Sequence, residues 1–268
     1  MPIGVAIINA LGQRRVTRIL GWLSNTRFPG LIVRTAIRIY IKIYHIDLSI
    51  YDFDIRTAKT FNAFFTRRLK PGVRTLEDGI VSPSDGYYFN GGLLKKARII
   101  QCKGFSSDQN KITTMGAFDH GSFATIYLSP GDYHRVHAPF DMTIDRLAFI
   151  PGKLYPVNEK SVLKVPELYC KNERVVLSGT SSYGRFYIVF IGAMIVGKTI
   201  LSFEPYWKEL IRKKQRFDRE VQYEMAKFEE LGYFELGSTV LLIMEDEILN
   251  DIALQPVSRV LVGQHLCG

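Results

Sequence analysis

Residues 185–201 read RFYIVFIGAMIVGKTIL, a run dominated by Ile, Val, Phe and Tyr and interrupted by glycines. β-Branched and aromatic residues are enriched in strands, and glycines mark the turns and bends between them. Comparable runs stand at 124–128 (ATIYL), 174–179 (RVVLSG) and 238–245 (STVLLIME). The sequence therefore predicts an α+β, mainly β fold with a barrel-like or sandwich-like core.

The chain before this β region has a different texture. Residues 31–44 (LIVRTAIRIYIKIY) have a helical pattern, and Thr60 is placed to cap a second short helix, which a Pro-Gly pair ends near residue 70. We expect two parts: an N-terminal helical membrane-association segment, 1–75, and a β-rich catalytic domain, 76–268. The charged stretch from 205 to 230 is compatible with either a helix or a mobile excursion.

Composition narrows the class of protein. With 47% hydrophobic and 23% charged residues among 268, the chain is globular. Its three cysteines lie far apart without C-x-x-C spacing, which argues against a disulfide scaffold or a zinc finger. No apolar run reaches the roughly 18 residues needed to span a bilayer. Residues 1–45 contribute +7 of the net charge of +9, and no nucleic-acid-binding motif accompanies this charge, so we expect no nucleic-acid partner.

The basic residues of the first helix fall on one stripe. Arg34, Arg38 and Lys42 are spaced four residues apart on an otherwise apolar helix. Such a helix can lie in a membrane interface, with its apolar side in the acyl boundary and its cations at anionic head groups. A helix packed on the domain with its charges in water fits this segment equally well. The absence of acidic residues before residue 46 favours the membrane.

Two targeting signals also fit the N-terminus poorly. A secretory signal has its charge before the apolar stretch, whereas GVAIINALG precedes Arg14 and Arg15. A mitochondrial transit peptide is Ser-rich, and Ser24 is the only serine before His45, so this remains a minor alternative. We expect a peripheral protein on the cytoplasmic side of a bacterial cell membrane.

Two of the five histidines, His134 and His137, lie in YLSPGDYHRVHAPF (127–140). On a regular strand they face opposite sides, so both serve one site only if a bulge or turn intervenes. The preceding Ser-Pro-Gly-Asp at 129–132 makes such a turn plausible. A metal site needs a third ligand and no H-E-x-x-H motif is present, so we expect no metal.

Two further motifs have ordinary structural explanations when taken singly. Asp85 lies in SPSDGYY (82–88), whose residue types favour a surface turn. Ser238 lies in FELGSTVLL (234–242), where Gly237 would mark a bend at the start of a strand. Only their combination with the histidines suggests chemistry.

Four segments together resemble the bacterial phosphatidylserine decarboxylases, the self-processing pyruvoyl enzymes of membrane lipid synthesis. They are SPSDG, YLSPGDYHRVHAP, GAMIVG and LGYFELGSTV. TFNAFFTRRLKPGVR, FIPGKLYPVN and KNERVV also look like that family, so the resemblance covers nearly the whole chain in the same order. The departures are local: a charged insert at 206–228, and Phe228 where a glycine is often found.

The resemblance implies self-cleavage between Gly237 and Ser238, giving a large chain (1–237) and a small chain (238–268). It assigns Ser238 as nucleophile, His137 as its base and Asp85 as the group that orients His137. Ser238 then becomes a covalent pyruvoyl cofactor, whose Schiff base with phosphatidylserine releases CO2 and yields phosphatidylethanolamine. His134 is the expected proton donor or head-group contact, with His137 as its rival.

The expected partners are phosphatidylserine in an anionic membrane and the two chains of one precursor, with a homodimer left open. Two other functions compete with this one. A serine hydrolase could use Asp85, His137 and Ser238 on external esters or peptides. A lipid-binding relative could have lost its activity, although three intact motifs argue against it.

Overall fold

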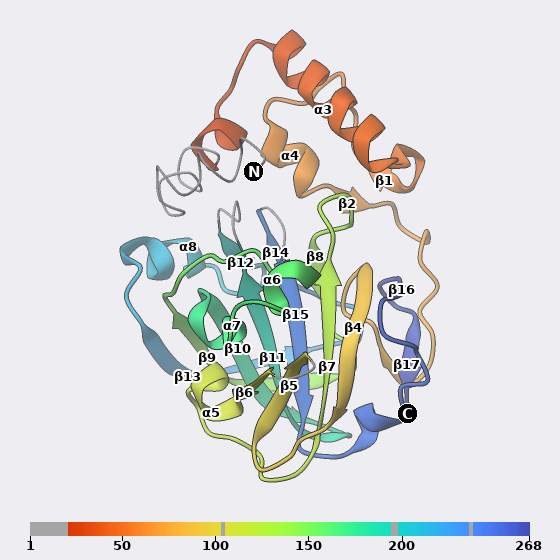
Figure 1. Ribbon diagram of the computed structural model, residues 1–268. Helices are drawn as coiled ribbons and strands as arrows, with labels where there is room; N and C mark the ends of the chain where they lie inside the picture. The colour runs from red at the N-terminus through yellow and green to blue at the C-terminus, as the bar shows by residue number, and fades with distance from the viewer. Residues whose placement is uncertain (1–20, 103–104, 194–197, 236–237) are drawn as a thin grey trace.

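The computed structural model describes residues 21–102, 105–193, 198–235 and 238–268. It has a helical N-terminal part that stands on one end of a β-rich body (Figure 1). The mainly β prediction is confirmed, since strands make up the body and the helices there are short.

Within residues 21–75, the N-terminal part consists of short helical segments and a small pair of strands. Its elements are α3 (Gly30–Tyr44), η1 (Leu48–Ile50), β1 (Tyr51–Asp52), α4 (Phe61–Phe65) and β2 (Arg68–Leu69). The Thr60 hydroxyl accepts a hydrogen bond from the Ala63 amide at 3.1 Å, which confirms the predicted cap. The helix ends at Phe65 rather than near residue 70, because the next residues pair with β1 as β2.

Helix α3 has one buried face. Val33 and Ile37 are buried there, in a small apolar cluster with Ala58 and Phe64 that is separate from the core of the β body. The rest of the helix surface includes exposed apolar side chains, 55–67% accessible, at Leu31, Ile32, Ile39 and Ile43. Packing therefore accounts for only part of the apolar surface of this helix. Within the described residues, no helix is long and apolar enough to cross a membrane.

One large antiparallel sheet organises the body. Its strands, in spatial order, are β13 (Phe217–Met225), β9 (Met142–Ile150), β10 (Arg174–Ser181), β11 (Gly184–Gly192), β15 (Ser238–Met244), β7 (Ser122–Leu128), β4 (Gly86–Leu93) and β16 (Ser258–Val260). Every residue of β15 is buried, so the sheet is covered on both faces at its centre.

Smaller elements cover this sheet. A three-stranded sheet holds β12 (Thr199–Leu201), β14 (Glu230–Phe234) and β8 (Arg135–His137). Two strand pairs are β3 (Ile80–Val81) with β17 (His265–Cys267), and β5 (Arg98–Cys102) with β6 (Phe105–Asp108). The short helices are α5 (Gln109–Thr113), α6 (Glu159–Val162), α7 (Leu168–Lys171), α8 (Trp207–Leu210), η2 (Ile211–Lys213) and η3 (Ile248–Asp251). In Figure 1 the β5–β6 pair and α5 to α7 lie in front of the large sheet.

The closed-barrel form of the prediction is wrong, because the sheet keeps two free edges, β13 and β16. β16 has only three residues, and β13 turns exposed charges such as Glu220 and Glu224 outward. Charged edge strands of this kind resist further pairing. The insert at 205–230 is neither a single helix nor a mobile excursion. It begins with the short helices α8 and η2 and continues as this edge strand, which is fixed to β9 by a bidentate pair of 2.7 Å bonds between Arg146 and Asp218.

Strand register defines the two ends of the large sheet. Tyr127 of β7 pairs with Tyr87 on one side and Thr239 on the other. We call this the Ser238 end; Ser122 pairs with Leu93 and Met244 at the opposite end. The helical part contacts the Ser238 end, because Tyr40 donates to the Pro130 carbonyl at 2.8 Å and Arg67 to the Gly131 carbonyl at 3.0 Å.

Candidate active site

Ser238 is the first residue of the central strand β15. It pairs with Leu128 of β7 and Gly192 of β11, and its side chain is completely buried. Its hydroxyl oxygen has no hydrogen-bond partner among the described residues. A buried hydroxyl without a partner is costly, so this oxygen is free for chemistry or for a group absent from the structure. The predicted cleavage partner Gly237 lies outside the described residues.

Asp85 lies directly before β4, at the same end of the sheet. β4 approaches β7 so closely that a Cβ at Gly86 would lie 2.5 Å from the Tyr127 carbonyl oxygen, which accounts for the glycine after Asp85. One carboxylate oxygen of Asp85 accepts from Arg74 at 2.6 Å and the other from the Val262 amide at 2.8 Å. Asp85 is thus held in a buried ion pair.

His137 is the last residue of β8, and its amide donates to the Pro83 carbonyl at 2.8 Å, which brings β8 beside the Asp85 turn. Its ring lies between Tyr133 and Phe228, with centroids 5.7 and 4.9 Å away and planes tilted by 28° in both cases. Nδ1 donates to the Phe228 carbonyl at 2.7 Å, so Nε2 is the acceptor for the Tyr133 hydroxyl at 2.9 Å. Burial lowers the pKa of His137.

His134 precedes β8 and follows the predicted turn, which is confirmed: the Asp132 amide donates to the Ser129 carbonyl at 2.9 Å. Its Nδ1 donates to the Asp132 carbonyl at 2.8 Å, and its ring contacts Phe65 of α4 at 4.1 Å between centroids. Burial lowers the pKa of His134 to about 3. The ring is therefore neutral, and Nε2 is a buried lone pair without a partner in the described part of the chain.

Two arginines hold the turn that carries His134. Arg67 donates to the Gly131 carbonyl at 3.0 Å and lies over the Tyr51 ring at 4.1 Å. Arg259 bonds the buried carboxylate of Asp132 at 2.5 Å. These residues, with Arg74 and Tyr133, are absent from the sequence-based candidates. Arg67 and Arg74 lie in FFTRRLKPGVR, a segment that resembles the family. This resemblance was the sequence signal that could have identified them as site residues.

The predicted Asp85, His137 and Ser238 gather at one end of the sheet without hydrogen bonds to each other. Asp85 and Ser238 lie on strands that flank β7, and two strand spacings amount to roughly 10 Å. The side-chain bonds of Asp85 go to Arg74 and Val262, and those of His137 go to Phe228 and Tyr133. The assignment of these three residues stays a prediction. Among the described residues, no cluster of His, Cys, Asp or Glu is arranged to hold a metal ion.

Comparisons with known proteins identify the family of this chain. The family model described as phosphatidylserine decarboxylase matches residues 61–268. The phosphatidylserine decarboxylase proenzyme of Psychrobacter arcticus is 35% identical, with 96% of this chain and 95% of that protein covered. The proenzyme of the same name from Stutzerimonas stutzeri is 35% identical, with 96% and 91% covered, and that of Ectopseudomonas mendocina is 37% identical, with 87% and 86% covered.

These matches define the class of the protein: a decarboxylase, similar to proteins named as proenzymes. The chain belongs to the phosphatidylserine decarboxylase family.

The buried neutral His134 predicts a dependence of stability on pH. Its pKa falls from 6.5 to about 3 on folding, so between these values the unfolded chain binds a proton that the folded chain does not. The free energy of unfolding should therefore be fully retained above pH 6.5 and fall on acidification, by up to about 1.4 kcal/mol per pH unit from this residue.

Urea denaturation at pH 7 and pH 5 measures this dependence. The free energy of unfolding should fall less between these pH values for His134→Gln than for the wild type. The exposed His120 provides a control, since His120→Gln should keep the wild-type loss. Equal losses in all three proteins would contradict this account.

A second prediction concerns the effect of Phe228 on the pKa of His137. Its φ of 72° lies in the left-handed region, which costs a non-glycine residue about 1–2 kcal/mol, yet its ring covers His137. Phe228→Gly removes that strain and also the apolar cover, so water reaches the imidazole and the pKa of His137 should rise towards its ordinary value. An NMR titration of the imidazole signals measures this shift. Phe228→Leu keeps an apolar cover and should move the pKa less; a lower pKa in Phe228→Gly would show that the ring does not exclude water.

Proposed function

We propose that this chain converts phosphatidylserine to phosphatidylethanolamine and CO2 with a pyruvoyl group made from Ser238. The observation that carries the proposal is the Ser238 hydroxyl, which is buried and without a partner at the start of the central strand. Ser238 is the serine of LGST, a motif on which the family resemblance depends.

The first step is self-cleavage. The Ser238 oxygen attacks the Gly237 carbonyl carbon, the peptide C–N bond breaks, and the chain is joined through an ester instead. Loss of the Ser238 α-proton and cleavage of the Cβ–O bond release residues 1–237 with a C-terminal carboxylate. Water then replaces the nitrogen, which leaves as ammonia, so the new end of residues 238–268 carries the pyruvoyl group.

A base must take the proton of the Ser238 hydroxyl, and we assign this role to His137. Its lowered pKa keeps the ring neutral near pH 7 and able to accept a proton. Against burial, the Phe228 carbonyl, the charge of Glu230 and, to a smaller extent, that of Asp85 favour the imidazolium. The assignment of Asp85 as the group that stabilises the protonated base therefore rests mainly on the family resemblance. The bond from Tyr133 to Nε2 has to open before Ser238 reaches that atom directly.

The residues around Ser238 fit such a group. Ser238 and His134 are both completely buried, and Oγ of Ser238 and Nε2 of His134 have no hydrogen-bond partner among the described residues. Once formed, the pyruvoyl group supplies a ketone for the substrate amine and a neighbouring carbonyl that takes up electrons as CO2 leaves. His134 can accept a proton on Nε2 from the substrate ammonium and return it to the former α-carbon of the substrate. Phe65 and Asp132 hold the ring for this transfer.

Residue Ser238 provides the decisive test. The wild-type protein should appear in a denaturing mass spectrum as two chains, one of 237 residues and one of 31 residues that is lighter by one ammonia than a serine-ended peptide. Ser238→Ala should remain a single chain and release no CO2 from phosphatidylserine, whereas Ser178→Ala should be cleaved normally. A cleaved Ser238→Ala protein would overturn the scheme. Labelling of Ser238 by a fluorophosphonate in an uncleaved wild type would favour the serine hydrolase.

Helix α3 supplies a second part of the proposal: contact with the bilayer that holds the substrate. The exposed Leu31, Ile32, Ile39 and Ile43 run beside the basic stripe of Arg34, Arg38 and Lys42. A helix that simply packs on the domain accounts for the buried Val33 and Ile37 but leaves these apolar side chains in water. An interfacial position accounts for both sets. This supports a position at the membrane surface, and our proposal keeps the expected cytoplasmic side of the cell membrane.

Vesicle binding tests this contact. Ile39→Asn/Ile43→Asn should lower the affinity for phospholipid vesicles by about tenfold or more, because two apolar side chains no longer enter the acyl boundary. Leu76→Asn/Leu163→Asn is a matched control, since both leucines are exposed and lie outside α3. Co-sedimentation measures the affinity, and equal binding of the two double variants would refute the role of α3.

A further inference from the structure

The charged insert contains a compact group of cations that the decarboxylation scheme does not use. Residues 206–216 (YWKELIRKKQR), here named the basic loop, comprise α8, η2 and the residues leading into β13. The loop has five lysines and arginines and a single acid, so its formal charge is +4. Subtracting this and the +7 of residues 1–45 from the total of +9 leaves −2 for all other residues. The basic loop is thus one of the segments of the chain in which cations clearly outnumber acids.

Two buried apolar side chains attach the basic loop to the β body, and its cations are exposed. Trp207 is buried, and its indole nitrogen donates to the Thr199 carbonyl at 2.8 Å, while Ile211 is also buried. The cationic residues are exposed: Lys208, Arg212, Lys213, Lys214 and Arg216. Tyr206, beside them, is 66% accessible. Within the described part of the chain, only Lys214 among the five cations forms an ion pair, with Glu173 at 2.6 Å.

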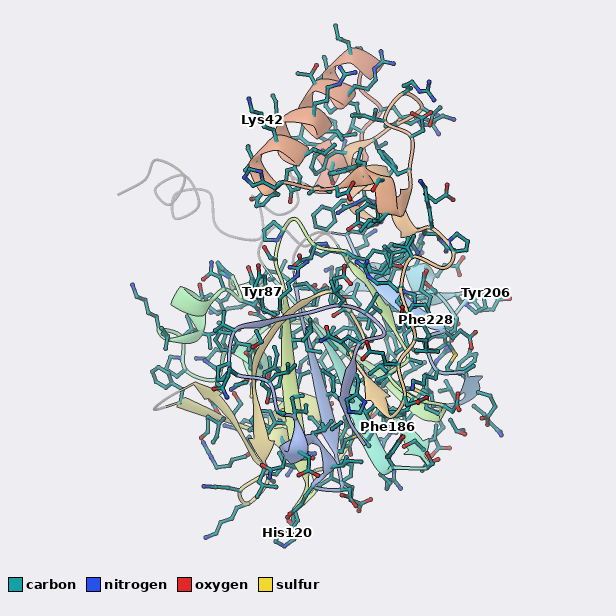
Figure 2. All side chains as sticks on the ribbon, turned by 90° about the vertical axis from the view of Figure 1, so that its right-hand side faces the viewer. Lys42, Tyr87, His120, Phe186, Tyr206 and Phe228 are labelled. Atoms are coloured by element: carbon teal, nitrogen blue, oxygen red, sulfur yellow. The ribbon has the colours of Figure 1, made fainter. Side chains whose placement is uncertain are left out.

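Strand register places the basic loop at the Ser238 end of the sheet. Phe217, the residue after the loop, pairs with Phe149 of β9, and successive pairings across β10 and β11 lead to Val240, two residues after Ser238. Lys208 lies close enough to the half-buried Glu235 to lower the pKa of that carboxyl, against a larger rise from burial. Figure 2 shows Tyr206 at the height of Tyr87, with His120 at the opposite end.

The helical part occupies the same end. Asn62 of α4 donates to Glu235 at 3.4 Å, and Tyr40 of α3 bonds the turn after β7. The exposed apolar side of α3, the buried serine and the basic loop therefore all lie at one end of the β body. A bilayer that approaches the Ser238 end would therefore face the basic loop as well as the helical part.

We propose that the basic loop is a second membrane contact, which binds the anionic head groups of phospholipids at the Ser238 end of the sheet. This inference rests on the proposed function for its choice of partner: a lipid substrate and an interfacial α3 favour a bilayer over a nucleic acid or an acidic protein. Exposed Tyr206 suits the same surface, because tyrosine is enriched at the level of lipid head groups. Each cation near an anionic surface strengthens binding, and head groups held here raise the local concentration of anionic lipid at the site.

The test compares two double variants that remove the same charge. Arg212→Gln/Lys213→Gln changes the basic loop; Lys95→Gln/Lys96→Gln removes two exposed lysines after Leu93, at the opposite end of the sheet. Binding to vesicles of phosphatidylcholine, with and without phosphatidylglycerol, is measured by co-sedimentation. Because phosphatidylglycerol has no serine, binding is read independently of decarboxylation. The loop variant should bind the phosphatidylglycerol vesicles roughly 10- to 30-fold more weakly than wild type and show a weaker dependence of binding on salt.

Activity on detergent-dispersed phosphatidylserine completes the experiment. The loop variant should cleave itself and release CO2 from dispersed substrate at the wild-type rate, and lose activity only on vesicles. Vesicle binding like that of wild type, or an equal loss in the Lys95→Gln/Lys96→Gln control, would overturn the inference. If the wild type releases no CO2 at all, the proposed function fails, and the vesicle measurement still decides whether the loop binds anionic lipid.

Discussion

The pairing of β15 with β7 on one side and β11 on the other is the constraint on which the site depends. It buries the strand completely and fixes Ser238 at its first position, opposite Leu128 and Gly192. A shift of one residue would turn every side chain of the strand to the other face. The chain after β7 then turns back over the same end, which brings both histidines of the 127–140 segment to the level of that serine.

Burial determines the charge state of the groups around Ser238. His134 and His137 are kept neutral by their apolar surroundings, and each has its tautomer set by a backbone carbonyl that accepts from Nδ1. The buried carboxylates Asp85 and Asp132 are instead compensated by Arg74 and Arg259. The site thus combines neutral bases with paired acids, and the proton traffic of the proposed reaction falls to the imidazoles.

Sequence patterns predicted strands, a helix cap and a turn, but they did not predict contacts between residues far apart in the chain. The strand at 184–192, the Thr60 cap and the turn at 129–132 all follow from residue types close in sequence. The carbonyl that holds His137 belongs to Phe228, 91 residues away, and no periodicity identifies it. The sequence analysis did not predict strand β13. Its residues alternate between half-buried positions, such as Val221 and Tyr223, and exposed ones, but many of them are charged, as is typical of an edge strand, so the stretch does not look like a strand in sequence.

The strands after Ser238 do not form a unit of their own: β15 pairs with β7 and β11, β16 with β4, and β17 with β3. A cut before Ser238 would therefore leave a 31-residue fragment threaded through two sheets, held by the same ladders and core as in the uncut chain. Its release would require the whole body to open. Once separated, the two chains could refold only after a bimolecular encounter. The stability of the cleaved protein would therefore depend on a slow rate of unfolding, since refolding would be inefficient.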